Sequence, residues 1–405
     1  MLEHLRPQYA KAFRCIGSDC EDTCCHGLDV VIDRAGYDRL RSLSDLQQQV
    51  QQHFAILPVA SEKQYARIQL MDTYTCPFLS GERLCSIQQK HGDYFLADIC
   101  ATYPRLSQRI DGLRETSLLL SCPEAARLVL LNPNLLPDDA ANPARYQRFL
   151  QMEPARGNGR PHQFLWDIRE FSLLLIRDRN YALWQRLFIL GRFCKRLNDV
   201  TQAGQLELIP RLLAEYARMI HDGVLRAPMD GIRAQPTRQL SLVLEIINRQ
   251  LGMTDASHTR FRECVQSFLK GIHFDQSAAV ETFVPYYQEG YFRFYVPFMR
   301  EHPFIFENYL ANYIFRTRFP YGMDSEGNTR DPLTEYLAMV VLFAVIKGLL
   351  IGIAGHLGDT FGKDHVVKLV QTFAKAVEQC PKFEVSEYMA LVNAEGMAIL
   401  VKNDG

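Results

Sequence analysis

Residues 337–355 read LAMVVLFAVIKGLLIGIAG, an apolar stretch of nineteen residues with a single charge, in a chain of 405 residues. A stretch of this length would just span the hydrocarbon core of a bilayer. Lys347 lies near its centre, where a charge is costly in lipid, and the glycines at its end permit close packing against other helices. We therefore expect a buried core helix, and peripheral membrane contact or a true span are the alternatives.

On both sides of this stretch, apolar residues recur at three- and four-residue spacing, which is typical of helices with one buried face. The pattern covers residues 164–175, 181–200, 205–221, 237–252, 258–271, 300–316, 331–355 and 384–400. A loop is predicted at about 153–162, where the sequence EPARGNGRP combines prolines with glycines. We therefore expect a large all-helical domain over residues 129–405.

Residues 1–128 have shorter elements and many turns. Leu28–Ile32 is a candidate strand, and Asp33 is placed to cap a helix that follows it. Asp111 and Gly112 predict a tight hairpin turn, because this pair suits positive φ angles. The expected fold is therefore mainly α: a small Cys-rich α+β N-terminal module with short strands, followed by the all-helical domain.

Composition narrows the class of protein. With 47% hydrophobic and 22% charged residues, the chain has the composition of an ordinary globular protein. Its formal net charge is −1, and its basic residues are spread among acidic ones, so we expect no nucleic-acid partner. The first residues lack the apolar core of a signal peptide. We therefore expect a cytoplasmic protein, with membrane association as the alternative.

Cysteine use sets the N-terminal module apart. The chain has eleven cysteines. Eight of them lie within the first 122 residues: Cys15, Cys20, Cys24, Cys25, Cys76, Cys85, Cys100 and Cys122. Thiolates are soft donors that bind Zn²⁺ and iron–sulfur clusters strongly. Four thiolates close one site, so the eight allow two sites, or one site with spares. The alternatives to an iron–sulfur site are a structural zinc site, a disulfide framework and ordinary buried thiols. The spacing of the cysteines alone hardly favours iron over zinc as the bound metal.

Two cysteine positions carry further expectations. Cys122 precedes Pro123 and Glu124 at the start of a predicted helix, where unpaired N–H groups and the helix dipole would lower the pKa of its thiol. Cys24 and Cys25 are adjacent, and adjacent side chains point in different directions in most backbones. We therefore do not expect both of them on one cluster.

The cysteine-containing strings resemble those of the bacterial flagellin lysine-N-methylase family. They read CIGSDCEDTCCHG (15–27), CPFLSGERLCSI (76–87), CATYPR (100–105) and LSCPEAARL (120–128). A wider group of small zinc- or iron-chelating proteins has similar cysteine strings. Further along the chain, ENYLANYIFR (307–316) and FPYG (319–322) are similar to the C-terminal signature of the same methylase family. The resemblance therefore covers nearly the whole chain.

The resemblance implies transfer of a methyl group from S-adenosylmethionine to the ε-amine of a lysine in a protein, flagellin in the named cases. It also implies a [4Fe–4S] cluster held by the Cys-rich motif, with all eight cysteines as candidate ligands and zinc as the alternative metal. The cysteines do not match the Cys-x3-Cys-x2-Cys triplet of radical enzymes, so a radical mechanism is not implied. Expected partners are flagellin or another lysine-bearing protein. Peripheral membrane association and a homo-oligomer are further expectations.

Four other residues are candidates for cofactor binding. Tyr103 and Arg105 follow Cys100 closely and are expected beside the metal, where Arg105 would balance negative charge or bind a carboxylate. Tyr309 and Tyr313 are candidates because tyrosine faces attract cationic sulfonium groups, and core packing is the alternative. A second aromatic segment at 286–295 raises the same question. The alternative function is a non-enzymatic zinc- or iron-chelating or redox-sensing protein whose helical body binds a partner.

Overall fold

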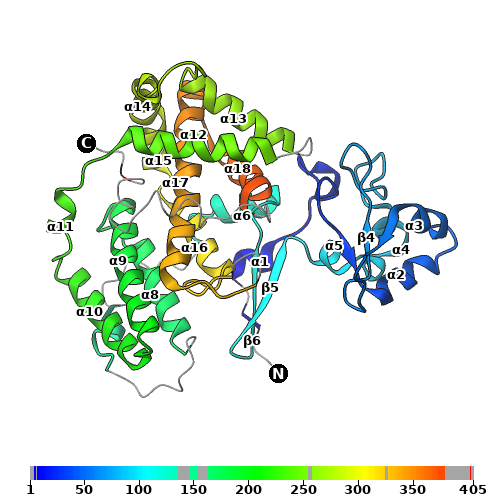
Figure 1. Ribbon diagram of the computed structural model, residues 1–405, viewed down its shortest axis with the longest axis horizontal. Helices are drawn as coiled ribbons and strands as arrows, with labels where there is room; N and C mark the ends of the chain where they lie inside the picture. Colours follow the sequence, from blue (N-terminus) through cyan, green and yellow to red (C-terminus); the bar gives the residue numbers. More distant parts are fainter. Residues whose placement is uncertain are drawn as a thin grey trace. The chain divides into compact units, whose positions relative to one another are not determined.

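The computed structural model of the chain is mainly helical, as the sequence predicts (Figure 1). It describes residues 4–5, 7–135, 146–153, 163–253, 258–323, 327–378 and 402. Most of the loop predicted at 153–162 and the whole helix predicted at 384–400 lie outside the described residues.

The chain divides into two compact units. Unit 1 comprises Met1–Leu128, Met253–Arg262 and Val370–Ala376, and unit 2 comprises Val129–Gly252, Glu263–Leu369 and Val377–Gly405. The chain passes from unit 1 to unit 2 between residues 128 and 129, and two later segments return to unit 1. Distant parts of the sequence therefore contribute to the cysteine-rich unit.

Unit 1 contains two small sheets. The first has the strand order β1-β6-β5 and is formed by β1 (His4–Leu5), β5 (Arg105–Ile110) and β6 (Leu113–Leu118). β5 and β6 are antiparallel and joined at Asp111 and Gly112, whose φ angles are 49° and 82°, so the predicted hairpin turn is confirmed. The second sheet is antiparallel with the order β2-β4-β3, formed by β2 (Val31–Ile32), β3 (Phe54–Ile56) and β4 (Ala66–Ile68).

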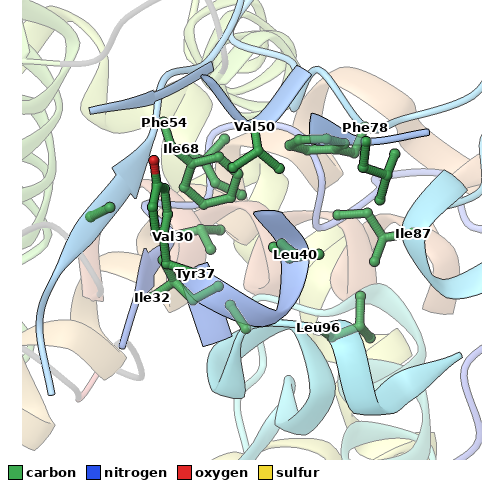
Figure 2. Close-up of a cluster of buried hydrophobic side chains, with 13 residues drawn as sticks. Val30, Ile32, Tyr37, Leu40, Val50, Phe54, Ile68, Phe78, Ile87 and Leu96 are labelled. Carbon is green, nitrogen blue, oxygen red and sulfur yellow. The ribbon is translucent and has the colours of Figure 1, made fainter. Parts of the chain in front are cut away.

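Short helices surround the second sheet and build a small core with it. The helical elements up to residue 130 are α1 (Gln8–Ala12), η1 (Gly17–Asp19), α2 (Arg34–Arg41), α3 (Gln47–His53), α4 (Ser86–His91), η2 (Asp93–Phe95), α5 (Asp98–Thr102) and α6 (Pro123–Leu130). The side chain of Asp33 accepts a hydrogen bond from the N–H of Gly36, which confirms the predicted cap of α2. In Figure 2, Phe78, Ile87 and Leu96 lie in one buried cluster with Leu40. This cluster holds the chain segments that carry three of the cysteines.

The helices that follow make up the large body of the chain. In chain order they are α7 (Gln147–Leu150), α8 (Leu165–Arg177), α9 (Leu183–Gln202), η5 (Leu206–Leu208), α10 (Ile209–His221), α11 (Ala227–Asp230), α12 (Pro236–Met253), α13 (Thr259–Gly271), η7 (Val280–Thr282), α14 (Val284–Gly290), η8 (Tyr291–Tyr295), α15 (Val296–Glu301), α16 (Phe304–Arg316), α17 (Pro332–Leu357), η9 (Gly358–Thr360), α18 (Lys363–Phe373) and η10 (Ala374–Glu378). The helices predicted within 181–271 and 300–355 are thus confirmed, although their first and last residues differ from the predicted ones. Two of these elements, η8 and η10, are π-helices.

The helix α17 forms the centre of unit 2, where α9, α14, η8 and α16 pack around it (Figure 1). Of its most apolar window, 94% is buried inside the protein, as expected for the core helix that its apolar sequence predicts. Two of its glycines let neighbours approach closely. A Cβ at Gly348 would lie 2.4 Å from Val243, and a Cβ at Gly352 would lie 2.4 Å from the ring of Phe268. These glycines are therefore needed for packing.

Candidate functional site

The centre of the thiol-rich region is the meeting of two chain segments. An antiparallel bridge joins His26 to Thr75, and the N–H of Cys76 donates to the carbonyl of Cys25 over 2.7 Å. As a result, the thiol of Cys25 is hydrogen-bonded to the thiols of both Cys24 and Cys76. Residues that are fifty positions apart in the sequence thus form one contiguous set of three sulfur atoms.

Two further cysteines border this set because the small core positions their segments. A second antiparallel bridge pairs Leu79 with Cys85, and the N–H of Leu79 donates to the carbonyl of Cys76. The half-buried side chains of Cys76, Cys85 and Cys100 all pack against the cluster that contains Phe78. The thiols of Cys85 and Cys100 lie close enough to Cys25 that its charge raises the pKa of each. We call Cys24, Cys25, Cys76, Cys85 and Cys100 the inner thiol group.

The remaining three cysteines form an outer thiol group of Cys15, Cys20 and Cys122. Charges on Cys20 and Cys15 raise the pKa of Cys122, and a charge on Cys15 also raises the pKa of Cys24. The two groups are therefore neighbours, and the structure brings together all eight cysteines that the sequence singled out. The ten cysteines that the structure describes are free thiols, without a disulfide among them.

Polar contacts fix the loop that carries Cys20 and Cys24. Asp22 binds the ammonium of Lys375 over 2.7 Å and the amide of Gln371 over 2.7 Å. The same Gln371 amide donates to the carbonyl of Ser121, next to Cys122, over 2.9 Å. These contacts come from the late segment Val370–Ala376, which belongs to unit 1. The C-terminal part of the chain therefore helps to position the first cysteine motif.

Burial is the main reason why four of these thiols hold their protons. It raises the pKa of Cys100 to about 12 and the pKa of Cys122 to about 11, and it also raises the pKa of Cys20 and Cys85. Cys25 is the exception, because hydrogen bonds from Cys24 and Cys76 lower the pKa of its thiol. A cation in this region would offset the burial cost and release protons from the thiols.

One expectation from the sequence is wrong, and the premise of another does not hold. The pKa of Cys122 is raised, since burial outweighs the backbone N–H groups of Glu124 and Ala125 that do lower it, as the helix-start argument predicted. Cys24 and Cys25 lie in a turn, and their thiols are hydrogen-bonded to each other, so these adjacent side chains do not point in different directions. The expectation that they do not both bind one cluster stays a prediction.

The thiols are gathered without forming a coordination shell. In the part of the chain that the structure describes, no three His, Cys, Asp or Glu side chains are arranged to hold a metal ion. The type of donor nevertheless suits a soft metal, because the inner group consists entirely of sulfur.

Tyr103 and Arg105 lie in the same neighbourhood as the cysteines. The hydroxyl of Tyr103 is hydrogen-bonded to Ser121 Oγ over 2.9 Å, and burial raises its pKa well above the usual value, with smaller contributions from Cys122 and Cys24. Arg105 donates to the carbonyl of Phe13 over 3.1 Å and covers the Phe13 ring, two residues before Cys15. Both side chains thus support the chain segments that carry cysteines, and their predicted role toward a cofactor stays a prediction.

Tyr309 and Tyr313 lie in the interior of unit 2. Tyr309 is 1% exposed, and its hydroxyl donates to Glu378 Oε1 over 2.8 Å. Arg316 binds the other oxygen of Glu378 over 2.7 Å and covers the ring of Tyr313. The contacts of both tyrosines are those of a buried polar network, and their assignment to a cofactor pocket stays a prediction.

Other residues of the same signature are equally engaged. Glu307 is 2% exposed and accepts hydrogen bonds from Arg179 and from Arg186 Nη1, the latter over 2.8 Å. The amide of Asn308 donates to three carbonyls at and after the end of α6, those of Val129, Leu130 and Asn132. The signature strings therefore specify buried polar contacts that hold the helices of unit 2 together.

Unit 2 contains a pocket of about 410 Å³ beside the aromatic segment 286–295 noted in the sequence. Its walls are aromatic and apolar, and three cations line it. The lining residues are Ala182, Leu183, Trp184, Arg186, Tyr291, Tyr295, Val296, Met299, Arg300, Pro303, Phe306, Phe343 and Lys347. The sequence argument noted Tyr291, Tyr295 and Lys347 but did not bring them together. In the sequence, the feature that could have pointed to this pocket is Lys347, the single charge inside the apolar stretch 337–355.

Comparison with known proteins supplies the class of protein. The lysine-N-methylase of Salmonella typhimurium strain LT2 is 25% identical over 378 residues, which cover 91% of this chain and 90% of that protein. The lysine-N-methylase of Salmonella choleraesuis strain SC-B67 matches over the same extent. The flagellar biosynthetic protein FliU of Salmonella muenchen is 28% identical over 132 residues, which cover 32% of this chain and 78% of that protein. No solved structure matches the chain.

These relatives place the chain in the class of lysine methyltransferases. The family described as the FliB lysine N-methylase C-terminal domain matches residues 169–400, which include the signature strings of α16 and the segment after it. The chain belongs to the FliB lysine N-methylase family. The resemblance read from the sequence is therefore confirmed over the helical body.

Proposed function

We propose that this enzyme transfers a methyl group from S-adenosylmethionine to a lysine ε-amine of flagellin or a similar protein, and that its thiol-rich unit holds a [4Fe–4S] cluster. The observation that carries the proposal is the combination of family membership with eight cysteines gathered in one unit. The name of a shorter relative, flagellar biosynthetic protein FliU, supports a flagellar substrate.

The residues present fit such a cluster by their chemistry. A [4Fe–4S] cluster is usually bound by four cysteine thiolates. The inner thiol group offers five, three of them in direct hydrogen-bond contact through Cys25. We propose that the ligands come from the inner group and that the outer group supplies any remaining ones. When bound, such a cluster would supply electron transfer or a rigid link between the segments that carry the cysteines.

The methyl-transfer chemistry sets demands on the site itself. A lysine with an ordinary pKa near 10.4 must lose its proton before its nitrogen can attack the methyl carbon. Burial in an apolar site lowers the pKa of a lysine amine, and a nearby base can take its proton. The lone pair of the neutral amine then forms the new N–C bond while the C–S bond of the sulfonium breaks, which yields a methylated ammonium on the lysine and a neutral thioether from the donor. Exclusion of bulk water and alignment of the two reactants provide much of the rate enhancement.

Metal content tests the cluster. The full chain is purified anaerobically, and iron, zinc and acid-labile sulfide are measured for the wild type and two variants. Cys76→Ala removes an inner thiol, whereas Cys264→Ala removes a buried thiol on the helix α13 and serves as the matched control. We expect iron and sulfide in the wild type and in Cys264→Ala, and their loss in Cys76→Ala. A colourless protein with stoichiometric zinc would overturn the cluster and leave methyl transfer to be judged on its own assay.

A further inference from the structure

Two cysteines of the inner thiol group, Cys25 and Cys76, face each other across two chain segments of unit 1. His26 and Thr75 form an antiparallel bridge, which places the residue before His26 opposite the residue after Thr75. The N–H of Cys76 donates to the carbonyl of Cys25 over 2.7 Å and fixes this pairing. The two cysteines are therefore directly opposite neighbours, although fifty residues separate them in the sequence.

The backbone geometry of this pair suits a disulfide bond. Directly opposite residues of an antiparallel pair have Cα atoms about 4.5–5.5 Å apart. A disulfide joins residues whose Cα atoms are about 4.4–6.8 Å apart. The thiols of Cys25 and Cys76 are already hydrogen-bonded to each other. Their sulfur atoms can therefore bond without a large movement of either backbone.

The second hydrogen-bonded neighbour of Cys25, the thiol of Cys24, does not suit such a bond. The peptide bond between these two residues is trans, because the cis bonds of the described chain precede Pro104 and Pro320. Consecutive Cα atoms across a trans peptide are about 3.8 Å apart, which is shorter than the span of a disulfide. Among the three contiguous sulfur atoms, the geometry thus favours the pair Cys25 and Cys76.

Both thiols are accessible to small reagents. Cys25 and Cys76 are half-buried free thiols, whereas Cys194 and Cys264 are fully enclosed in the protein. A small oxidant can therefore reach the pair, and a small thiol reductant can reach the bond that it forms. Accessible disulfides are the labile ones that exchange readily with thiols.

We propose that Cys25 and Cys76 form a reversible disulfide when the metal-free protein meets hydrogen peroxide, and that this bond closes the inner thiol group to metal. One sulfur attacks a peroxide oxygen, so an S–O bond forms, the O–O bond breaks, and the leaving oxygen departs with the thiol proton as water. The second sulfur attacks the first, so the S–S bond forms, the S–O bond breaks, and a second water leaves. The two thiols lose two electrons in total, and the peroxide gains them.

The disulfide would leave three thiols in the inner group, those of Cys24, Cys85 and Cys100. A closed zinc site or a [4Fe–4S] cluster usually takes four ligands, so the oxidised group is one ligand short. This second part rests on the proposed function, in which the inner thiols bind the metal. A dithiol reductant returns both thiols by exchange. Loading of metal thus depends on the redox conditions around the protein.

The cross-link is tested on the full chain without iron, methyl donor or flagellin. The protein is reduced, stripped of metal with a chelator, freed of reductant and treated with hydrogen peroxide, and remaining thiols are alkylated. After tryptic digestion, mass spectrometry should find the peptide of residues 15–34 joined to the peptide of residues 68–83. Fragmentation should place the bond between Cys25 and Cys76, and dithiothreitol added before alkylation should prevent its detection. No cross-link, or a bond between Cys24 and Cys25, would overturn the proposal.

Two variants assign the bond to one thiol of the first motif. Cys25→Ser should abolish the link between the two peptides, although the peptide of residues 15–34 keeps three other cysteines. Cys24→Ser is the matched control, because it removes the adjacent thiol, and it should form the link like the wild type. An undiminished link in Cys25→Ser would refute the assignment. The cross-link in the wild type is read directly, so the test does not depend on the folding of the variants.

Zn²⁺ binding tests whether the bond closes the site. Zn²⁺ is titrated into the reduced and the peroxide-treated full chain, since this ion binds thiolates and does not reduce disulfides. We expect at least about tenfold weaker binding after oxidation, because a ligand is missing, and recovery after dithiothreitol. Equal affinity in both forms would overturn the closing of the site. If the anaerobically purified protein holds no iron, yet the cross-link forms and weakens Zn²⁺ binding, the proposed cluster fails and this inference stands.

Discussion

Removal of one buried hydroxyl should measure how much the signature network stabilises unit 2. Tyr309→Phe deletes the donor that binds Glu378 over 2.8 Å in a site where Tyr309 is 1% exposed. Glu378 keeps its contact with Arg316 over 2.7 Å, so one of two charge-assisted contacts is lost. A hydrogen bond to a charged group contributes about 1.5–3 kcal/mol. We therefore expect the free energy of unfolding to fall by about 2 kcal/mol.

The assay is urea unfolding followed by tryptophan fluorescence. Both tryptophans of the chain, Trp166 and Trp184, lie in unit 2, so the signal reports on this unit. Tyr286→Phe is the matched control because Tyr286 is 41% exposed, and its effect should stay within about 0.5 kcal/mol. If Tyr309→Phe changes stability no more than the control does, the network reasoning is refuted. If it instead lowers methyl transfer while stability is unchanged, the hydroxyl of Tyr309 acts on substrate or cofactor.

Two further predictions concern close packing and thiol reactivity. Gly271→Ala would place a Cβ 1.8 Å from the carbonyl oxygen of Gly352, and backbone atoms cannot yield easily, so we expect a loss of about 3 kcal/mol in the same unfolding assay. Gly231→Ala meets open space and should cost little, and equal effects of the two would contradict the packing account. In the metal-free protein, Cys122, with a pKa of about 11, should be about one-thousandth ionised at pH 8. Its alkylation should therefore be slower than that of exposed Cys15 and should rise about tenfold per pH unit up to that pKa, as mass spectrometry of labelled peptides would measure; equal rates at pH 8 would contradict the burial argument.

Local signals in the sequence were sufficient where neighbouring residues decide the structure. Asp33 caps its helix and Asp111-Gly112 closes its hairpin because both features depend on a few adjacent backbone groups. The core helix 337–355 could be read from its composition and its glycines, since an apolar stretch with an internal lysine favours a protein interior over lipid.

The sequence was insufficient where burial and distant contacts decide. The pKa of Cys122 rises because tertiary packing buries its thiol, which no helix-start rule includes. The contact between Cys25 and Cys76 depends on a bridge between segments fifty residues apart. Lys347 and Arg186 meet at one pocket although they are far apart in the chain. Such encounters are properties of the fold as a whole.

The most direct test of the central account is methyl transfer itself. The anaerobically purified full chain is incubated with flagellin and S-adenosylmethionine that carries a deuterated methyl group, and flagellin peptides are analysed by mass spectrometry. The account predicts deuterated methyl groups on lysine side chains, dependent on enzyme and donor, and greatly reduced in Cys76→Ala but not in Cys264→Ala. Absence of labelled lysine with the iron-loaded wild type would contradict the proposed reaction. Full activity of Cys76→Ala would contradict the proposed role of the Cys76 thiol as a ligand of a cluster that the reaction needs.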